Sequence, residues 1–133
     1  MTRRELSDRG SATVELAVIF PAFLVLLFTG VQAAEWYQAR NLCLAAARHG
    51  VQVARTTTGT AADGRAAAQT FLTRAGGSAV FDPEVSSAGS TPTRVRIQVS
   101  ATAPTALPIP GLHLRVSQAS EAGKERYTTD SQP

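Results

Sequence analysis

The 133-residue sequence has few of the residues from which chemical sites are built, and its length allows at most one ordinary domain. It holds a single cysteine, Cys43, so no intramolecular disulfide and no cysteine-based metal site can form. The two histidines, His49 and His113, are isolated, and neither a catalytic triad spacing nor a glycine-rich phosphate loop is present. We therefore expect no enzyme, no metal, no cofactor and no small-molecule substrate.

Charge is also scarce, at 17% of residues, and the net charge is only +3. Such mild basicity does not indicate a nucleic-acid partner. Arg94 and Arg96 alternate along a predicted strand, where a solvated face is a better explanation than a site for acidic partners. Apolar residues reach 44%, with 23 alanines, which excludes a wholly disordered polyelectrolyte.

The longest apolar run is the most informative feature of the chain. Nineteen consecutive residues, Leu16 to Ala34, carry no charge. As a helix they extend about 28 Å, close to the roughly 30 Å hydrocarbon thickness of a bilayer. The chain is too small to surround such a helix on every side, so we predict a transmembrane helix, in which Pro21 removes one backbone hydrogen bond.

The charges beside this run predict its orientation. Arg3, Arg4 and Arg9 precede it, and no basic residue follows it before Arg40. The positive-inside rule then places the N-terminus in the cytoplasm and the C-terminal part outside the membrane. Two other interpretations remain open: signal-peptidase cleavage near Ala33 would release a secreted binding module, and an uncleaved helix would anchor an adhesive domain.

The border of the run carries a specific motif, RGSATVELAVIFPAFL, in which a basic leader ends at Gly10 and Glu15 directly precedes the apolar residues. This motif resembles the processing site of type IV pilin-like precursors, and most closely the TadE-like proteins of tight-adherence (Tad) pilus systems. The resemblance implies that a prepilin peptidase cleaves between Gly10 and Ser11. It also implies other pilin-like subunits and pilus assembly proteins as partners.

Glu15 would then be the fifth residue of the mature chain. Cleavage would create an α-ammonium group on Ser11, and Glu15 would lie about 6 Å along the same helix. The carboxylate could pair with its own terminus or with that of a neighbouring subunit, favouring register more than stability. Leu16 stands where major Tad pilins tend to carry an aromatic residue, and the chain is longer than theirs, so a minor pilin-like role is favoured.

The helix is expected to continue beyond the membrane. Trp36 and Tyr37 lie at the outer end of the run, where aromatic side chains favour the membrane interface. Beyond them, small residues share one face at helical spacing and allow close packing: Ala39, Cys43, Ala46, Ala47, Gly50 and Ala54. Polar residues form the opposite face, and the segment AAARHGVQVAR loosely resembles the same family.

The rest of the chain predicts a second helix and a small antiparallel sheet. The helix extends from Asp63 to Arg74, with Ala67, Phe71 and Ala75 on its apolar face. Strict alternation predicts a strand over Arg94–Ser100, and weaker patterns predict strands over Ala79–Val85 and Leu112–Ser117.

These elements predict an α+β fold with five parts along the chain, and the resemblance implies that this fold is pilin-like. They are a cytoplasmic leader (1–10), a transmembrane helix (11–34), a helical extension (35–57), an extracytoplasmic α+β domain (58–119) and a polar, disordered tail (120–133). The protein is therefore predicted to be a single-pass protein of the bacterial cytoplasmic membrane that enters or assists a surface pilus.

Overall fold

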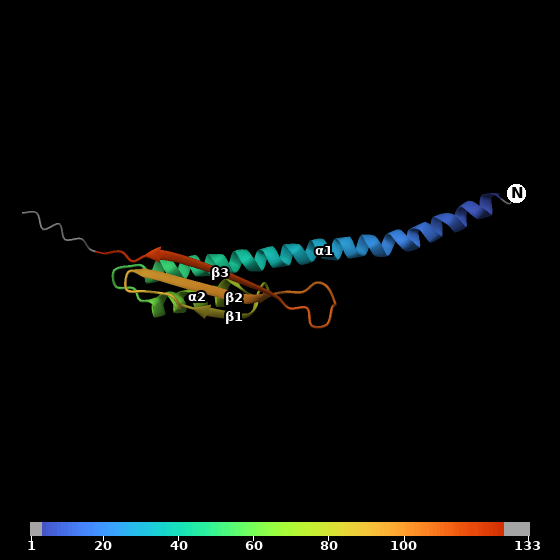
Figure 1. Ribbon diagram of the computed structural model, residues 1–133. Coiled ribbons are helices and arrows are strands. Elements are labelled where there is room, and N and C mark those ends of the chain that lie inside the picture. Colours follow the sequence, from blue (N-terminus) through green and yellow to red (C-terminus); the bar gives the residue numbers. More distant parts are fainter. Residues whose placement is uncertain (1–3, 127–133) are drawn as a thin grey trace, which may run out of the picture.

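The computed structural model describes residues 4–126, with side chains from residue 12 onward. It has two helices followed by three strands (Figure 1): α1 (Arg4–Ala54), α2 (Ala61–Ala75), β1 (Phe81–Ser86), β2 (Arg94–Ala103) and β3 (Leu114–Gly123). The predicted α+β class is confirmed. Helix α1 has 51 residues and continues through Pro21, and only its C-terminal half contacts the other elements (Figure 1).

The sheet is antiparallel in the order β1-β2-β3. Strands β2 and β3 pair along their whole length, from Arg94 opposite Gly123 to Ala103 opposite Leu114. Strand β1 is short, and its register shifts between Phe81 and Glu84, where Pro83 cannot donate a backbone hydrogen bond.

The limits of the third strand differ from the prediction. Strand β3 begins at Leu114 and ends at Gly123, so the predicted disordered tail was wrong for residues 120–123. Gln118 and Ser120 occupy inward positions of this strand and are half-buried. Polar residues at inward positions conceal the apolar alternation, although the backbone pairing with β2 continues. Residues 127–133 of the predicted tail lie outside the described part of the chain.

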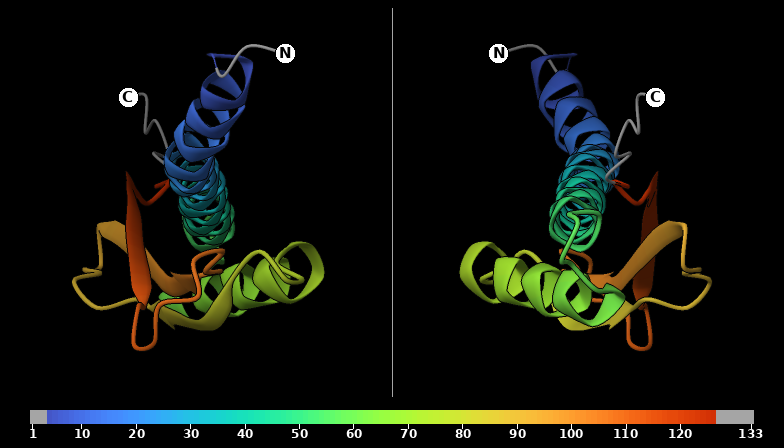
Figure 2. Two further views of the ribbon diagram at one scale, coloured as in Figure 1. Left: turned by 90° about the vertical axis from the view of Figure 1, so that its right-hand side faces the viewer. Right: turned by 90° about the vertical axis from the view of Figure 1, so that its left-hand side faces the viewer.

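Both helices pack on one face of the sheet. Helix α1 contacts β2 and β3, while α2 contacts β1 and β2, and the view along α1 shows the helices side by side (Figure 2). The sheet supplies the larger core side chains, with Val95, Ile97 and Val99 almost fully buried. The predicted small-residue face of α1 lies against them, and its members are all buried.

The two helices approach most closely where glycine faces glycine. A Cβ atom on Gly50 would lie 2.5 Å from the Gly64 carbonyl oxygen, and a Cβ on Gly64 would lie 2.6 Å from the Gly50 oxygen. Neither distance is possible without movement of the backbone. These two glycines therefore determine how closely α2 packs on α1.

A capping box starts α2. The Asp63 backbone N–H donates to the Thr60 hydroxyl (3.1 Å), and the Thr60 N–H donates to the Asp63 carboxylate (2.9 Å). The hydrogen bonds from Thr60 hold the pKa of Asp63 below its usual value. At the other end, the Gly76 N–H donates to the Leu72 carbonyl (2.7 Å).

The predicted buried face of α2 was wrong by one residue. Gly64, Ala68 and Leu72 are buried, whereas Ala67 and Phe71 are half-buried and Ala75 is exposed. The difference arises because the close contact at Gly64, a residue without a side chain, sets the rotation of the helix. The predicted extension of α1 to residue 57 was also too long, since the helix ends at Ala54.

Candidate functional site

The N-terminal half of α1 exposes large apolar side chains on all sides. The exposed residues include Val14, Leu16, Val18, Ile19, Phe20, Phe23, Val25, Leu26, Leu27, Phe28 and Val31. By length and composition, α1 is the helix of the described chain that could cross a membrane. A helix that is apolar all round requires an apolar environment, which the α+β domain does not provide here (Figure 1).

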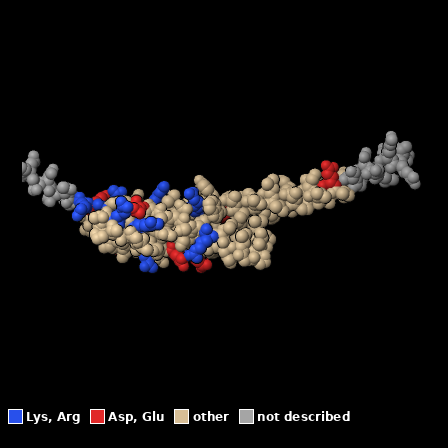
Figure 3. Space-filling view, in the orientation of Figure 1, with Lys and Arg blue, Asp and Glu red and all other residues tan. Residues whose placement is uncertain are grey.

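The predicted processing residues lie at the start of this helix. Gly10 and Ser11 belong to α1, just before residue 12, where the description of side chains begins. Glu15 is exposed, one turn further along the helix. The structure therefore places Glu15 at the edge of the apolar surface, and between it and the α+β domain the helix carries no charge (Figure 3).

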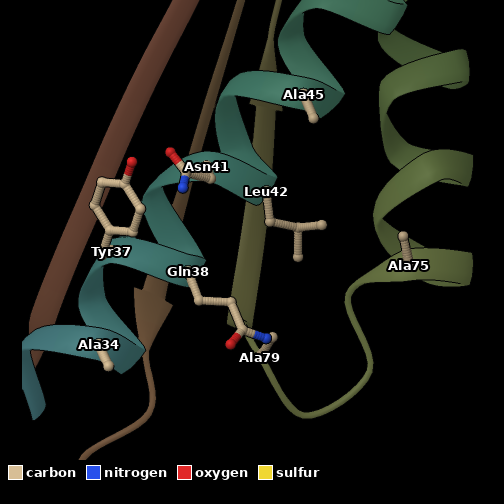
Figure 4. A pocket seen from close by; sticks show the side chains of 8 residues that line it. All are labelled: Ala34, Tyr37, Gln38, Asn41, Leu42, Ala45, Ala75 and Ala79. Atoms are coloured by element: carbon tan, nitrogen blue, oxygen red, sulfur yellow. The ribbon is translucent and has the colours of Figure 1, made fainter. Parts of the chain in front are cut away.

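The two predicted interface aromatics lie at the opposite end of the apolar surface. Trp36 is 41% exposed and Tyr37 is 58% exposed. Tyr37 borders an open groove of about 530 Å³ between α1 and the end of α2 (Figure 4). The groove has no charged lining residue; it is lined by Ala34, Tyr37, Gln38, Asn41, Leu42, Ala45, Ala75 and Ala79.

Sequence reasoning missed the residue that joins the apolar helix to the domain. The Gln32 side chain is 7% exposed, and both ends of its amide are paired. Its Nε2 donates to the Pro104 carbonyl (3.0 Å), and its Oε1 accepts from the Ala106 N–H (2.8 Å). The available signal was an amide side chain within the apolar run, but its partners are more than 70 positions away.

The other residues considered in the sequence analysis lie in environments that are ordinary for a folded protein. Cys43 is fully buried on the small-residue face of α1, and burial raises the pKa of its thiol. His49 is exposed, with its ring centroid 5.6 Å from that of Phe71. Arg94 pairs with Glu121 (2.9 Å) on the outer face of the sheet. Within the described residues, no group of three or more His, Cys, Asp or Glu could hold a metal ion.

Residues 10–52 match the family model described as TadE-like protein. Over this segment, the chain is similar to TadE-like proteins. The match begins at Gly10 and includes Glu15, the apolar surface and most of the small-residue face, so the predicted resemblance is confirmed. It covers about a third of the 133 residues and ends before α2. No curated protein and no solved structure matches the chain.

The described residues combine a segment similar to TadE-like proteins with an apolar helix long enough to cross a membrane. The segment coincides with nearly all of α1, while α2 and the sheet lie beyond it. The small-residue face within the segment is the surface on which the domain packs. The arrangement can hold a folded domain at one end of an apolar helix.

Proposed function

We propose that this protein is a minor pilin-like subunit that assists assembly or export of a Tad-type pilus. In this proposal a prepilin peptidase cleaves between Gly10 and Ser11, on the cytoplasmic side, and α1 remains in the membrane. The observation that carries the proposal is the Gly10–Glu15 spacing at the edge of an exposed apolar helix, within a TadE-like segment. The protein acts by helix packing and catalyses no reaction.

The position of Gln32 supports retention of the apolar helix. Signal-peptidase cleavage near Ala33 would separate Gln32 from the domain to which its amide is bonded. The Pro104 carbonyl and the Ala106 N–H would both lose their partner, which is unfavourable for polar groups that are partly buried. Helix α1 is also continuous across residues 33 and 34, with no exposed loop at which a peptidase could act.

Glu15 is assigned to subunit assembly. After cleavage its carboxylate would lie one turn from the new α-ammonium group of Ser11, at the boundary of the membrane. A charge in this position is stabilised by an opposite charge, from its own chain or from a neighbouring subunit. Glu15→Gln should therefore leave cleavage intact and reduce recovery of the protein in complexes with pilus subunits, as measured by crosslinking in cells.

Replacement of Gly10 tests the peptidase step. In cells that carry the native secretion genes, Gly10→Leu should leave the protein at its precursor mass, because the bulky side chain would block the peptidase. Gly30→Leu is the matched control, since a Cβ atom at Gly30 has no neighbour within 4 Å. Cleavage of Gly10→Leu at the same site as the unaltered protein would refute the processing claim.

A further inference from the structure

The β2–β3 loop has the composition of a membrane-contacting segment. Its residues 104–112 read PTALPIPGL and carry no charge. Ile109, at the tip, is 54% exposed, and Pro108 and Pro110 beside it are exposed as well. An exposed apolar tip of this kind is unfavourable in water and favourable at an apolar surface.

In several residues of the loop the backbone N–H is either absent or already paired. Three of residues 104–112 are prolines, which have no N–H group. The N–H groups of Ala106, Ile109 and Leu112 are already bonded, to Gln32, Leu107 and Ile109 respectively (2.8, 2.8 and 3.2 Å). Desolvating this irregular segment therefore costs less than desolvating an ordinary loop, which suits it to the interfacial layer of a bilayer.

Gln32 fixes the depth of the loop relative to the apolar helix. Its side chain holds the loop backbone at Pro104 and Ala106. Along α1, Gln32 lies three residues before Glu35, the first charged residue after the apolar run. At the rise of an α-helix, this point lies about 4.5 Å on the membrane side of Glu35. From there the loop projects further, beyond the end of the sheet and toward the N-terminal half of α1 (Figure 1).

The surface around the loop is continuous with the apolar surface of the helix. The side of α1 near Gln32 exposes Phe28 and Val31, at 40% and 42%. Charged side chains gather on the α+β domain, while the loop and the adjoining part of α1 carry almost none in the view of Figure 3. Trp36 and Tyr37 lie just beyond Glu35, where aromatic side chains mark a membrane interface.

We propose that the β2–β3 loop is a second membrane contact, whose tip, Leu107–Pro110, enters the outer interfacial layer of the same bilayer that α1 spans. This inference rests on the membrane-spanning part of the proposed function. The contact would limit how far α1 and the domain packed on it can tilt relative to the membrane, because the helix and the loop would enter the bilayer at two separate points.

Nitroxide accessibility tests the loop and the span separately. The full chain carries Cys43→Ala, so that single introduced cysteines can be spin-labelled, and is placed in vesicles of phosphatidylcholine and phosphatidylglycerol. The label stands at Ile109→Cys, at Val25→Cys within the apolar run, or at Thr57→Cys beyond the far end of α1. Collision with oxygen, which concentrates in lipid, is compared with collision with a water-soluble nickel complex.

We expect the oxygen-to-nickel ratio at residue 109 to lie nearer to the Val25 value than to the Thr57 value. A ratio at residue 109 equal to that at Thr57, with Val25 in lipid, would overturn the loop contact and leave the membrane span intact. If Val25 itself were accessible to the nickel complex, the span would fail, and the loop contact would fail with it.

Discussion

At the scale of single residues, Gln32 couples the apolar helix to the α+β domain. Its amide bonds two backbone groups of the β2–β3 loop, so Gln32→Leu would leave the Pro104 carbonyl and the Ala106 N–H without their partner. We expect a loss of about 1–3 kcal/mol in the free energy of local opening. Hydrogen exchange at the Ala106 amide should accelerate accordingly.

The control for this prediction is Gln38→Leu, an equivalent change at an exposed glutamine on the same helix. Exchange at Ala106 should not change in that variant. Equal protection of Ala106 in Gln32→Leu and in the unaltered protein would show that Gln32 does not hold the loop.

Gly50 is a second residue at which the structure predicts the effect of a single substitution on stability. Alanine normally stabilises a helix by about 1 kcal/mol relative to glycine. At Gly50, however, the added Cβ would lie 2.5 Å from the Gly64 carbonyl oxygen. We expect Gly50→Ala to lower the free energy of unfolding by about 1–3 kcal/mol, because the helices must separate.

The measurement is denaturant unfolding of the full chain in detergent micelles, followed by circular dichroism. Gly30→Ala makes the same change in the same helix, where no neighbour lies within 4 Å, and should be neutral or stabilising. If both variants had the same stability, the close contact between α1 and α2 would be absent.

At the scale of elements, the capping box makes the start of α2 dependent on pH. The pKa of Asp63 is lowered in the folded protein by its hydrogen bonds with Thr60. A lowered pKa contributes stability above the unfolded-state pKa, and this contribution is lost as the pH falls through the folded-state value. Asp63→Asn should therefore be less stable than the unaltered protein near neutral pH, and the difference should shrink in acid.

Unfolding of the two proteins between about pH 6 and about pH 2 measures this difference. Asp82→Asn serves as the control, because Asp82 lies in β1 at a φ of 47°, a conformation that asparagine tolerates. A stability difference between Asp63→Asn and the unaltered protein that stays constant over this range would contradict the role of the cap.

The elements also show what the sequence could predict. The buried face of α1 follows from small residues at helical spacing, and β2 follows from strict alternation of apolar side chains. Both patterns are local. The rotation of α2 depends on a glycine contact with another helix, and the second half of β3 depends on pairing with β2, so neither could be recognised from its own residues.

The residues of the candidate site also divide into those with a local signal in the sequence and those without one. Glu15, Trp36 and Tyr37 could be predicted as candidates because their positions relative to a single apolar run carry the signal, and their roles stay predictions. Gln32 and the β2–β3 loop could not be predicted, because their relation appears only when residues more than 70 positions apart meet in the fold. Contacts of that range leave no periodic trace in either segment.

At the scale of the whole molecule, a long apolar helix carries a small domain that packs only on the helix's second half (Figure 1). The exposed apolar side chains of the first half suit a helix that crosses a membrane. The buried small residues of the second half form the face on which the domain packs. The TadE-like match covers most of both halves, so the family signature and the helix describe nearly the same segment.

The intact mass and N-terminal sequence of the membrane-bound protein, purified from cells that hold its native secretion genes, test the central claim most directly. We predict a mature chain that begins at Ser11 and retains α1. A chain that begins near Ala34 and is released from the membrane would contradict the proposal and indicate a secreted module. A chain that still carries residues 1–10 would contradict pilin-type processing.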